Sequence, residues 1–170
     1  MTTRSIVQIG SFEVDRDQTT RWRSGELRKE WVERFPQLFD SDDLRLAESQ
    51  GPQGFHFSEW LGAIILFHLT GYLSLVSKYE FPRHKGKQVI LGKFLPKPVL
   101  ALMKDHPDLG GTQCPDLLAY SPDLSDWFFC EVKGPGDRLR ERQRIYFDRL
   151  ARVSGRPISL LRFKWRPKRP

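Results

Sequence analysis

Two short runs of aliphatic, β-branched and aromatic residues, separated by a turn-rich segment, constrain the fold of this chain most. The runs cover residues 115–120 and 127–133, and the segment between them, 121–126, is rich in Pro, Ser and Asp. Strand-forming runs that flank such a segment favour an antiparallel hairpin. The following Gly-Pro-Gly at residues 134–136 ends the second strand with a sharp turn.

The predicted hairpin carries two carboxylates and a lysine that can meet. Side chains alternate across a strand, so Glu131 and Lys133 share one face, and Asp116 opens the partner strand. Carboxylates at close range repel each other, and a hard divalent cation such as Mg²⁺ relieves that repulsion. A metal-bound water can act as a nucleophile that Lys133 orients or deprotonates. An ordinary ion pair is the alternative interpretation of the same residues.

The motifs over residues 115–165 resemble one nuclease family. Pro-Asp, Glu-Val-Lys, Gly-Pro-Gly-Asp-Arg-Leu and a downstream glutamine are similar to the VRR-NUC branch of the PD-(D/E)xK nuclease superfamily, which includes Holliday junction resolvases and the Fanconi-associated nuclease. The resemblance implies an α/β fold with a restriction-endonuclease-like core, in which helices flank a mixed central β-sheet. We expect that core over residues 55–170, after an N-terminal helical extension at residues 1–54. Cys114 departs from the small glycine that the family often has there.

The resemblance also implies a metal-dependent DNA endonuclease with a defined set of site residues. Asp116 and Glu131 would ligate Mg²⁺, or alternatively Mn²⁺, with the Val132 carbonyl as a further ligand. Lys133 would position the nucleophile. Gln143 would support the site from a predicted helix that runs from residue 138 to 154 with Asp137 as its N-cap. A buried amide satisfied by the backbone is the alternative for Gln143. Its helical stripe is otherwise apolar and consists of Leu139, Tyr146, Leu150 and Val153.

A further acid is expected from an early helix. The uncharged segment at residues 61–76 predicts a long buried helix with Ser58 as its N-cap, which ends at Gly71 or Lys78. Glu59 lies at the edge of its buried face and would bind the metal directly or through water. An acid that only favours the helix dipole is the alternative. Rival candidates on an earlier predicted helix are Glu26, Glu30 and Glu33.

Positive charge is concentrated directly after the predicted site. Residues 134–170 contain 12 Lys and Arg against 3 Asp and Glu, a net of +9 in a chain of net charge +7. Such a patch is typical of proteins that bind a phosphate backbone, although a solvated helix face is the alternative. A basic loop that reaches DNA is expected at residues 81–98, around a short strand at 88–91, and a solvated connection is the alternative. The predicted DNA contacts are Arg138, Arg140, Arg142, Arg144, Arg149, Lys85 and Lys87.

The remaining patterns complete the prediction. Cys114 and Cys130 lack zinc-site spacing and predict reduced thiols in the core. The start of the chain has no apolar run typical of a signal peptide, so a cytoplasmic protein without a membrane partner is expected. Alternation predicts strands at residues 6–14 and 158–165. Helical spacing predicts helices at residues 25–35 and 41–50.

Two other functions fit the same residues. One is a module that binds branched nucleic acid without cutting it, and the other is a nuclease subunit that is active only with a partner protein. Such a partner could belong to a repair, mobile-element or defence assembly. The sequence leaves open a homodimer, and it leaves open whether the DNA substrate is a duplex, a flap or a junction.

Overall fold

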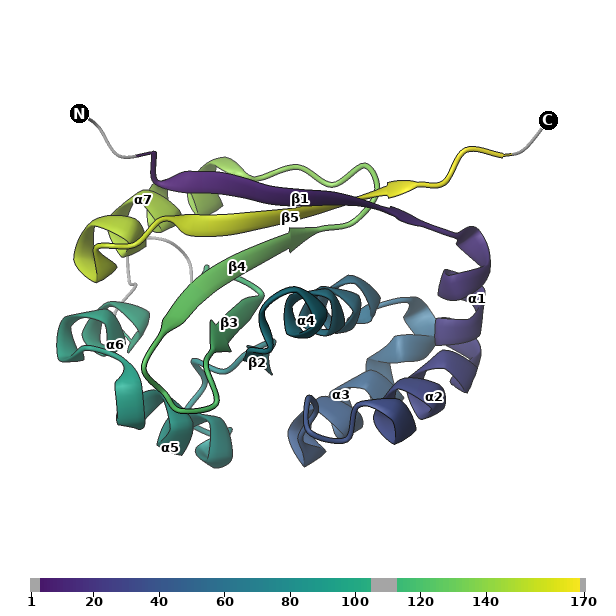
Figure 1. Ribbon diagram of the computed structural model, residues 1–170, viewed down its shortest axis with the longest axis horizontal. Coiled ribbons are helices and arrows are strands. Elements are labelled where there is room, and N and C mark those ends of the chain that lie inside the picture. Colours follow the sequence, from purple (N-terminus) through teal and green to yellow (C-terminus); the bar gives the residue numbers. More distant parts are fainter. Residues whose placement is uncertain (1–3, 105–112, 169–170) are drawn as a thin grey trace.

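A computed structural model describes residues 4–104 and 113–168, which form one five-stranded sheet with helices on both faces (Figure 1). The strand order is β1-β5-β4-β3-β2. β1, β5 and β4 are parallel, whereas β4, β3 and β2 pair antiparallel, so the predicted mixed sheet is confirmed. The strands are β1 (Ile6–Val14), β2 (Leu73–Val76), β3 (Leu117–Tyr120), β4 (Trp127–Lys133) and β5 (Ile158–Trp165).

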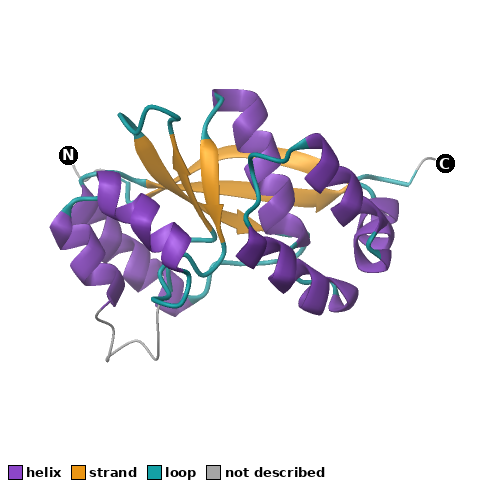
Figure 2. Cartoon of the chain, turned by 90° about the horizontal axis from the view of Figure 1, so that it is seen from below, coloured by secondary structure: helices purple, strands orange, loops and turns teal. Residues whose placement is uncertain are grey.

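The helices form two groups that the strands separate (Figure 2). One face of the sheet is covered by α1 (Arg16–Ser24), α2 (Glu26–Arg34), α3 (Ser41–Gln50), the short 3₁₀ helix η1 (Gly51–Gln53) and α4 (Phe57–Thr70). The other face is covered by α5 (Lys85–Phe94), α6 (Lys97–Lys104) and α7 (Glu141–Ser154). Within the described ranges, none of these helices has the length and apolar character needed to cross a lipid bilayer.

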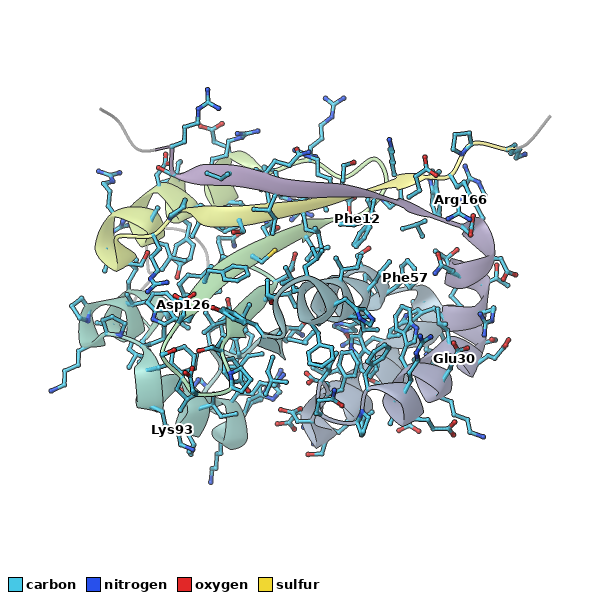
Figure 3. All side chains as sticks on the ribbon, viewed as in Figure 1. Phe12, Glu30, Phe57, Lys93, Asp126 and Arg166 are labelled. Carbon is cyan, nitrogen blue, oxygen red and sulfur yellow. The ribbon has the colours of Figure 1, made fainter. Side chains whose placement is uncertain are left out.

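Each face of the sheet has its own hydrophobic core. On the α4 face, Trp22 and Trp60 are buried edge to face, with ring centroids 5.2 Å apart. Figure 3 shows Phe57 in the same crowded layer, beside the N-terminal helices. On the α7 face, Tyr146 and Leu150 are completely buried against β4 and β5. Two separate cores therefore fix the sheet from both sides.

The alternation of β4 decides where its polar end points. Trp127 and Phe129 pack into the core under α7, whereas Cys130 and Val132 pack into the core under α4. Because side chains alternate along a strand, Glu131 continues the α7 face. The predicted hairpin is confirmed, since β3 and β4 pair antiparallel.

The long apolar segment forms a helix followed by a strand, so the helix stops at Gly71, the earlier of its two predicted ends. The N-cap of α4 is His56, not Ser58, and its last helical residue is Thr70. Gly71 then adopts a left-handed conformation with φ of 73°, which glycine tolerates without steric cost. The residues beyond it form β2, which the sequence did not predict and which pairs with β3.

Helix α7 begins later than predicted. Its N-cap is Arg140, and the backbone N–H of Asp137 instead donates to the carbonyl of Gly134 at 3.0 Å, which closes a tight turn. Gly155 ends the helix in a left-handed conformation. The predicted N-cap at Asp137 is therefore wrong, because the Gly-Pro-Gly turn extends farther than the capping pattern indicated.

The predicted basic loop at residues 81–98 is also wrong, and so is the short strand predicted at 88–91, because residues 85–94 form α5. The Lys87 ammonium is buried: its side chain is 1% exposed, and Nζ donates to Asp43 Oδ1 and to the Val76 carbonyl, both at 2.5 Å. A buried ammonium that joins α5 to α3 cannot reach a phosphate. Lys87 therefore leaves the predicted set of DNA contacts, whereas Lys85 is exposed.

The N-terminal residues are part of the central sheet. β1 lies within the predicted extension at residues 1–54, yet it runs parallel to β5 along its whole length. Helix α1, which the sequence did not predict, follows β1 and contributes Trp22 to the core. The extension and the core thus share one sheet.

Both cysteines are free thiols, as predicted. Cys130 is fully buried under α4. Cys114 is half-buried on the other face, where its Sγ lies 3.3 Å from the hydroxyl of Tyr146. The bulkier residue before Pro115 therefore packs against α7.

Stability should fall in acid because of His56, which is 9% exposed and whose Nε2 lies 2.6 Å from Gln50 Oε1. Burial, together with the positive charges of Lys78 and Lys87, lowers the pKa of His56 to about 4. A depressed pKa gives stability that is present above the unfolded value of about 6.5 and is lost as pH falls towards 4. Each unit of pKa difference between the folded and unfolded states is worth about 1.4 kcal/mol, so His56 is expected to contribute at most about 3 kcal/mol to the free energy of unfolding.

Urea unfolding of the parent and of His56→Asn at pH 7.5 and 4.5 checks this prediction. Asparagine tolerates the left-handed backbone that His56 adopts, with φ of 70°. We expect a smaller loss of stability between the two pH values in the variant, because it lacks the titrating ring. An equal loss in both proteins would show that His56 contributes nothing.

Candidate functional site

The end of β4 brings the predicted acids and the lysine into direct contact. Lys133 Nζ lies 2.6 Å from Glu131 Oε1. The antiparallel register puts Asp116 opposite Glu131, and the backbone N–H of Asp116 donates to Glu131 Oε2 at 3.2 Å. The backbone N–H of Val132 in turn donates to Asp116 Oδ2 at 2.9 Å. The hairpin alone therefore assembles these three side chains.

Gln143 connects α7 to this group. Its Nε2 donates to Glu131 Oε1 at 2.8 Å, and its Oε1 accepts from Lys133 Nζ at 3.2 Å. Oε1 also accepts from the backbone N–H of Arg140 at 3.1 Å, which caps the first turn of α7. The amide thus holds both charged groups as well as the helix end, and the backbone is only one of its three partners.

Glu59 enters the same region from the first turn of α4. A Cβ atom at Gly62 would lie 2.9 Å from Val132 Cγ2 and 3.2 Å from Leu117 Cδ1, so a glycine here allows α4 to approach the sheet closely. Glu59 lies one turn before Gly62. This close approach brings its carboxylate near Glu131, with which it interacts electrostatically.

The rival acids on α2 lie elsewhere. Glu26 and Glu30 form ion pairs with Arg21, at 2.9 and 2.5 Å. Glu33 lines a separate hollow between α2 and α3. Of the four early acids that the sequence offered, Glu59 is the one that lines the groove with Asp116 and Glu131.

Burial and like charge raise the pKa of two of the acids. The half-buried Asp116 has a pKa well above its usual range, because desolvation disfavours its charge and because Glu131 and Glu59 are close. The pKa of Glu59 is also raised, first by burial and then by the charges of Glu131 and Asp137. Buried carboxylates that repel one another in this way favour protons or a cation, and perturbed acids of this kind cluster at functional sites.

These side chains line an open groove of about 620 Å³. Two predicted arginines, Arg138 and Arg140, also line it, whereas Arg142, Arg144 and Arg149 are exposed on α7 outside its lining. Lys85 is likewise exposed but does not line the groove. The groove thus combines an acidic floor, formed by Glu59, Asp116 and Glu131, with a basic border, formed by Arg138 and Arg140.

The groove also contains residues that sequence reasoning assigned to other roles or omitted. Asp137 lines it and interacts electrostatically with Glu59. Ser58 meets the same turn: a Cβ atom at Gly134 would lie 3.1 Å from Ser58 Oγ and 3.2 Å from Asp137 Oδ2. The Gly-Pro-Gly-Asp motif was the available signal for Asp137. Ser58 had none, because it arrives through the packing of α4.

The donor chemistry fits a hard divalent cation. Asp116, Glu131 and Glu59 offer carboxylate oxygens, which Mg²⁺ prefers, and Lys133 offsets only one of these three charges. Among the described residues, no three His, Cys, Asp or Glu side chains already form a group that could hold a metal ion. The carboxylates do not form such a group because each has another partner: Glu131 contacts Lys133 and Gln143, whereas Asp116 accepts a hydrogen bond from the backbone of β4.

Comparison with known proteins supports the interpretation of these motifs. Residues 72–162 match the model of the VRR-NUC domain. No curated protein matches the chain. A solved structure described as paFAN1 bound to 2-nucleotide 5′ flap DNA with a gap is 20% identical, with a TM-score of 0.33. That alignment covers 89% of this chain and 22% of the solved one. Since the family model matches more than half of the residues, the chain belongs to the VRR-NUC domain family of the PD-(D/E)xK nuclease superfamily.

Proposed function

We propose that this chain is a metal-dependent endonuclease that hydrolyses DNA phosphodiester bonds, with a preference for branched, flap or junction DNA. The observation that carries the proposal is the convergence of Asp116, Glu131 and Lys133 in one groove bordered by arginines. Membership of a nuclease family supports it independently.

The acids would hold the metal. Asp116 and Glu131 would be its ligands, together with the carbonyl of Val132, and Glu59 would bind directly or through a water. A bound divalent ion stabilises charge on phosphate oxygens and makes a coordinated water a better nucleophile. The raised pKa values of Asp116 and Glu59 agree with this role, because burial and the charges of neighbouring carboxylates disfavour the ionised acids, and a bound cation would relieve both effects.

Lys133 would act on the nucleophile. Its side chain is 11% exposed at the groove, and its ammonium is held between Glu131 and Gln143. From there it can orient the attacking water, or donate to the phosphate oxygens as their charge increases. Gln143 would keep this ammonium in position, and it would also orient Glu131 through its second hydrogen bond.

The basic border would bind the DNA backbone. Arg138 and Arg140 line the groove, and the exposed arginines of α7 extend the positive surface beyond it. Arginines that face phosphates fix position and orientation without reading bases. The expected recognition is therefore of backbone shape, which is consistent with selection of DNA structure over sequence.

Replacement of Asp116 by alanine tests the proposal. Labelled duplex, flap, four-way junction and single-stranded DNA would be incubated with Mg²⁺, with Mn²⁺ or with EDTA. We expect metal-dependent cleavage by the parent and a loss of at least about 10³-fold in Asp116→Ala, because a metal ligand is removed. Asp148→Ala, which removes an exposed acid of α7, is the matched control and should cut normally.

Other results would support the competing functions. Salt-sensitive DNA binding by parent and variant without any cleavage would indicate a binding module. Cleavage that appears only after a second protein is added would indicate a subunit of a larger assembly. Equal cleavage by Asp116→Ala and the parent would contradict the proposed site.

A further inference from the structure

An exposed aromatic side chain stands at the rim of the acidic groove. Phe55 is 61% exposed and lines the groove that contains Glu59, Asp116 and Glu131. Other exposed apolar side chains, such as Leu69 and Val89, lie outside the groove lining. A large aromatic ring that is exposed to water next to a charged groove contributes little to the core. Its position therefore favours contact with a ligand that has an apolar face.

The backbone around Phe55 is fixed on both sides. Gly54 and His56 both adopt left-handed conformations, with φ of 92° and 70°. The Trp22 Nε1–H donates to the carbonyl of Phe55 at 2.9 Å, and Trp22 itself is completely buried. His56 is anchored by Gln50. The ring is therefore presented by a tight and well-supported turn.

Charges next to the ring identify the kind of ligand. Arg138 and Arg140 line the same groove, and the Arg23 guanidinium lies against the turn, 3.0 Å from the position of a Cβ atom at Gly54. An aromatic platform beside arginines is the combination that binds unpaired nucleotides, because the ring stacks on a base while the cations contact phosphates. In a continuous duplex the faces of the bases are already stacked on each other. A face is open to the ring only at an unpaired base, as in a flap, or where the base stack is interrupted, as at a nick or junction.

We propose that Phe55 stacks on an unpaired base next to the scissile phosphate, and that this contact makes the groove prefer interrupted DNA over continuous duplex. The inference rests on the proposed nuclease function and adds a specificity-determining residue to it. Phe55 acts on substrate choice, whereas the acids and Lys133 act on the phosphodiester.

Fluorescence of 2-aminopurine tests the contact without metal. Flap DNA with 2-aminopurine at its first unpaired position would be titrated with the full chain in EDTA. Stacking on an aromatic ring quenches this base, so we expect quenching by the parent and by Phe55→Trp but not by Phe55→Ala. We also expect Phe55→Ala to bind flap DNA roughly 5- to 100-fold more weakly than the parent does, and to lose less affinity for continuous duplex. Phe55→Leu should resemble Phe55→Ala, because it is apolar but has no aromatic face.

Leu69→Ala is the matched control, since Leu69 is 62% exposed and lies near the C-terminal end of α4, whereas Phe55 lies just before the N-terminal end of that helix. The inference would be overturned if Phe55→Ala kept the quenching and the flap affinity of the parent. It would also be overturned if Phe55→Leu kept both. If the parent cuts DNA with Mg²⁺ and neither Phe55→Ala nor Phe55→Leu changes its preference for flap over duplex, the inference about Phe55 is overturned while the nuclease function stands. A parent that cuts no DNA contradicts the nuclease function instead, because the quenching measurement requires no cleavage.

Discussion

Replacement of Lys133 by alanine is expected to reduce DNA cleavage by at least about 10²-fold while DNA affinity changes little. The Lys133 ammonium contacts Glu131 and Gln143 deep in the groove, whereas the exposed arginines around it provide the contacts with the DNA backbone. Removing it takes away the group that orients the nucleophile and leaves the main binding surface intact. Single-turnover cleavage with saturating Mg²⁺ and fluorescence anisotropy in EDTA would measure the two effects separately.

Lys93→Ala is the matched control for Lys133→Ala. Lys93 is an exposed lysine on α5, far from the end of β4 (Figure 3). Its loss should leave cleavage unchanged. Thermal unfolding of Lys133→Ala would show whether the fold survives when Glu131 loses its ion-pair partner. A folded Lys133→Ala protein that cuts DNA as fast as the parent would exclude Lys133 from the reaction.

Elements whose pattern is local were predictable. Strands β1 and β5 and helix α3 have the bounds that alternation and first-turn acids indicated. The hairpin of β3 and β4 was also accessible, because both strands and their turn lie within twenty residues. For the same reason the contacts among Asp116, Glu131 and Lys133 could be anticipated: they depend on strand alternation and on one antiparallel register.

Elements that depend on distant contacts were missed. Helix α1 is strongly polar and buries only Trp22, so its apolar signal is a single side chain. Strand β2 was hidden within an apolar segment, and its strand character comes from pairing with β3. The basic composition of α5 suggested a loop, because nothing in the local sequence indicates that Lys87 finds a carboxylate on α3.

The candidate site shows the same division. Gln143 could be recognised as a polar residue on an apolar stripe, although its helix begins later than expected. Glu59 could be named only as one of several acids, because its position depends on how closely Gly62 lets α4 approach the sheet. Asp137 was assigned to the wrong role, since a capping pattern cannot distinguish a helix N-cap from a turn residue that lines a groove.

Replacement of Lys87 by alanine is expected to destabilise the protein by about 3–5 kcal/mol, with a fall in Tm of roughly 10 °C. Lys87 and Asp43 are 1% and 4% exposed at their side chains, and the ammonium also bonds to the carbonyl of Val76 at the end of β2. Burial raises the pKa of Asp43 to about 7 even with the lysine present. Without Lys87, the fold must bury an uncompensated carboxylate or protonate it.

Urea unfolding of Lys87→Ala, with Lys85→Ala as the control, would measure this effect. Lys85 is exposed on the same helix, so its loss should change stability by less than about 0.5 kcal/mol. The double variant Asp43→Asn/Lys87→Met should lose less than the sum of its single variants, because it removes both charges together and keeps an acceptor for the backbone N–H of Asp40. A loss below about 1 kcal/mol in Lys87→Ala would contradict this account, and would mean that the ion pair is not what holds α5 against α3.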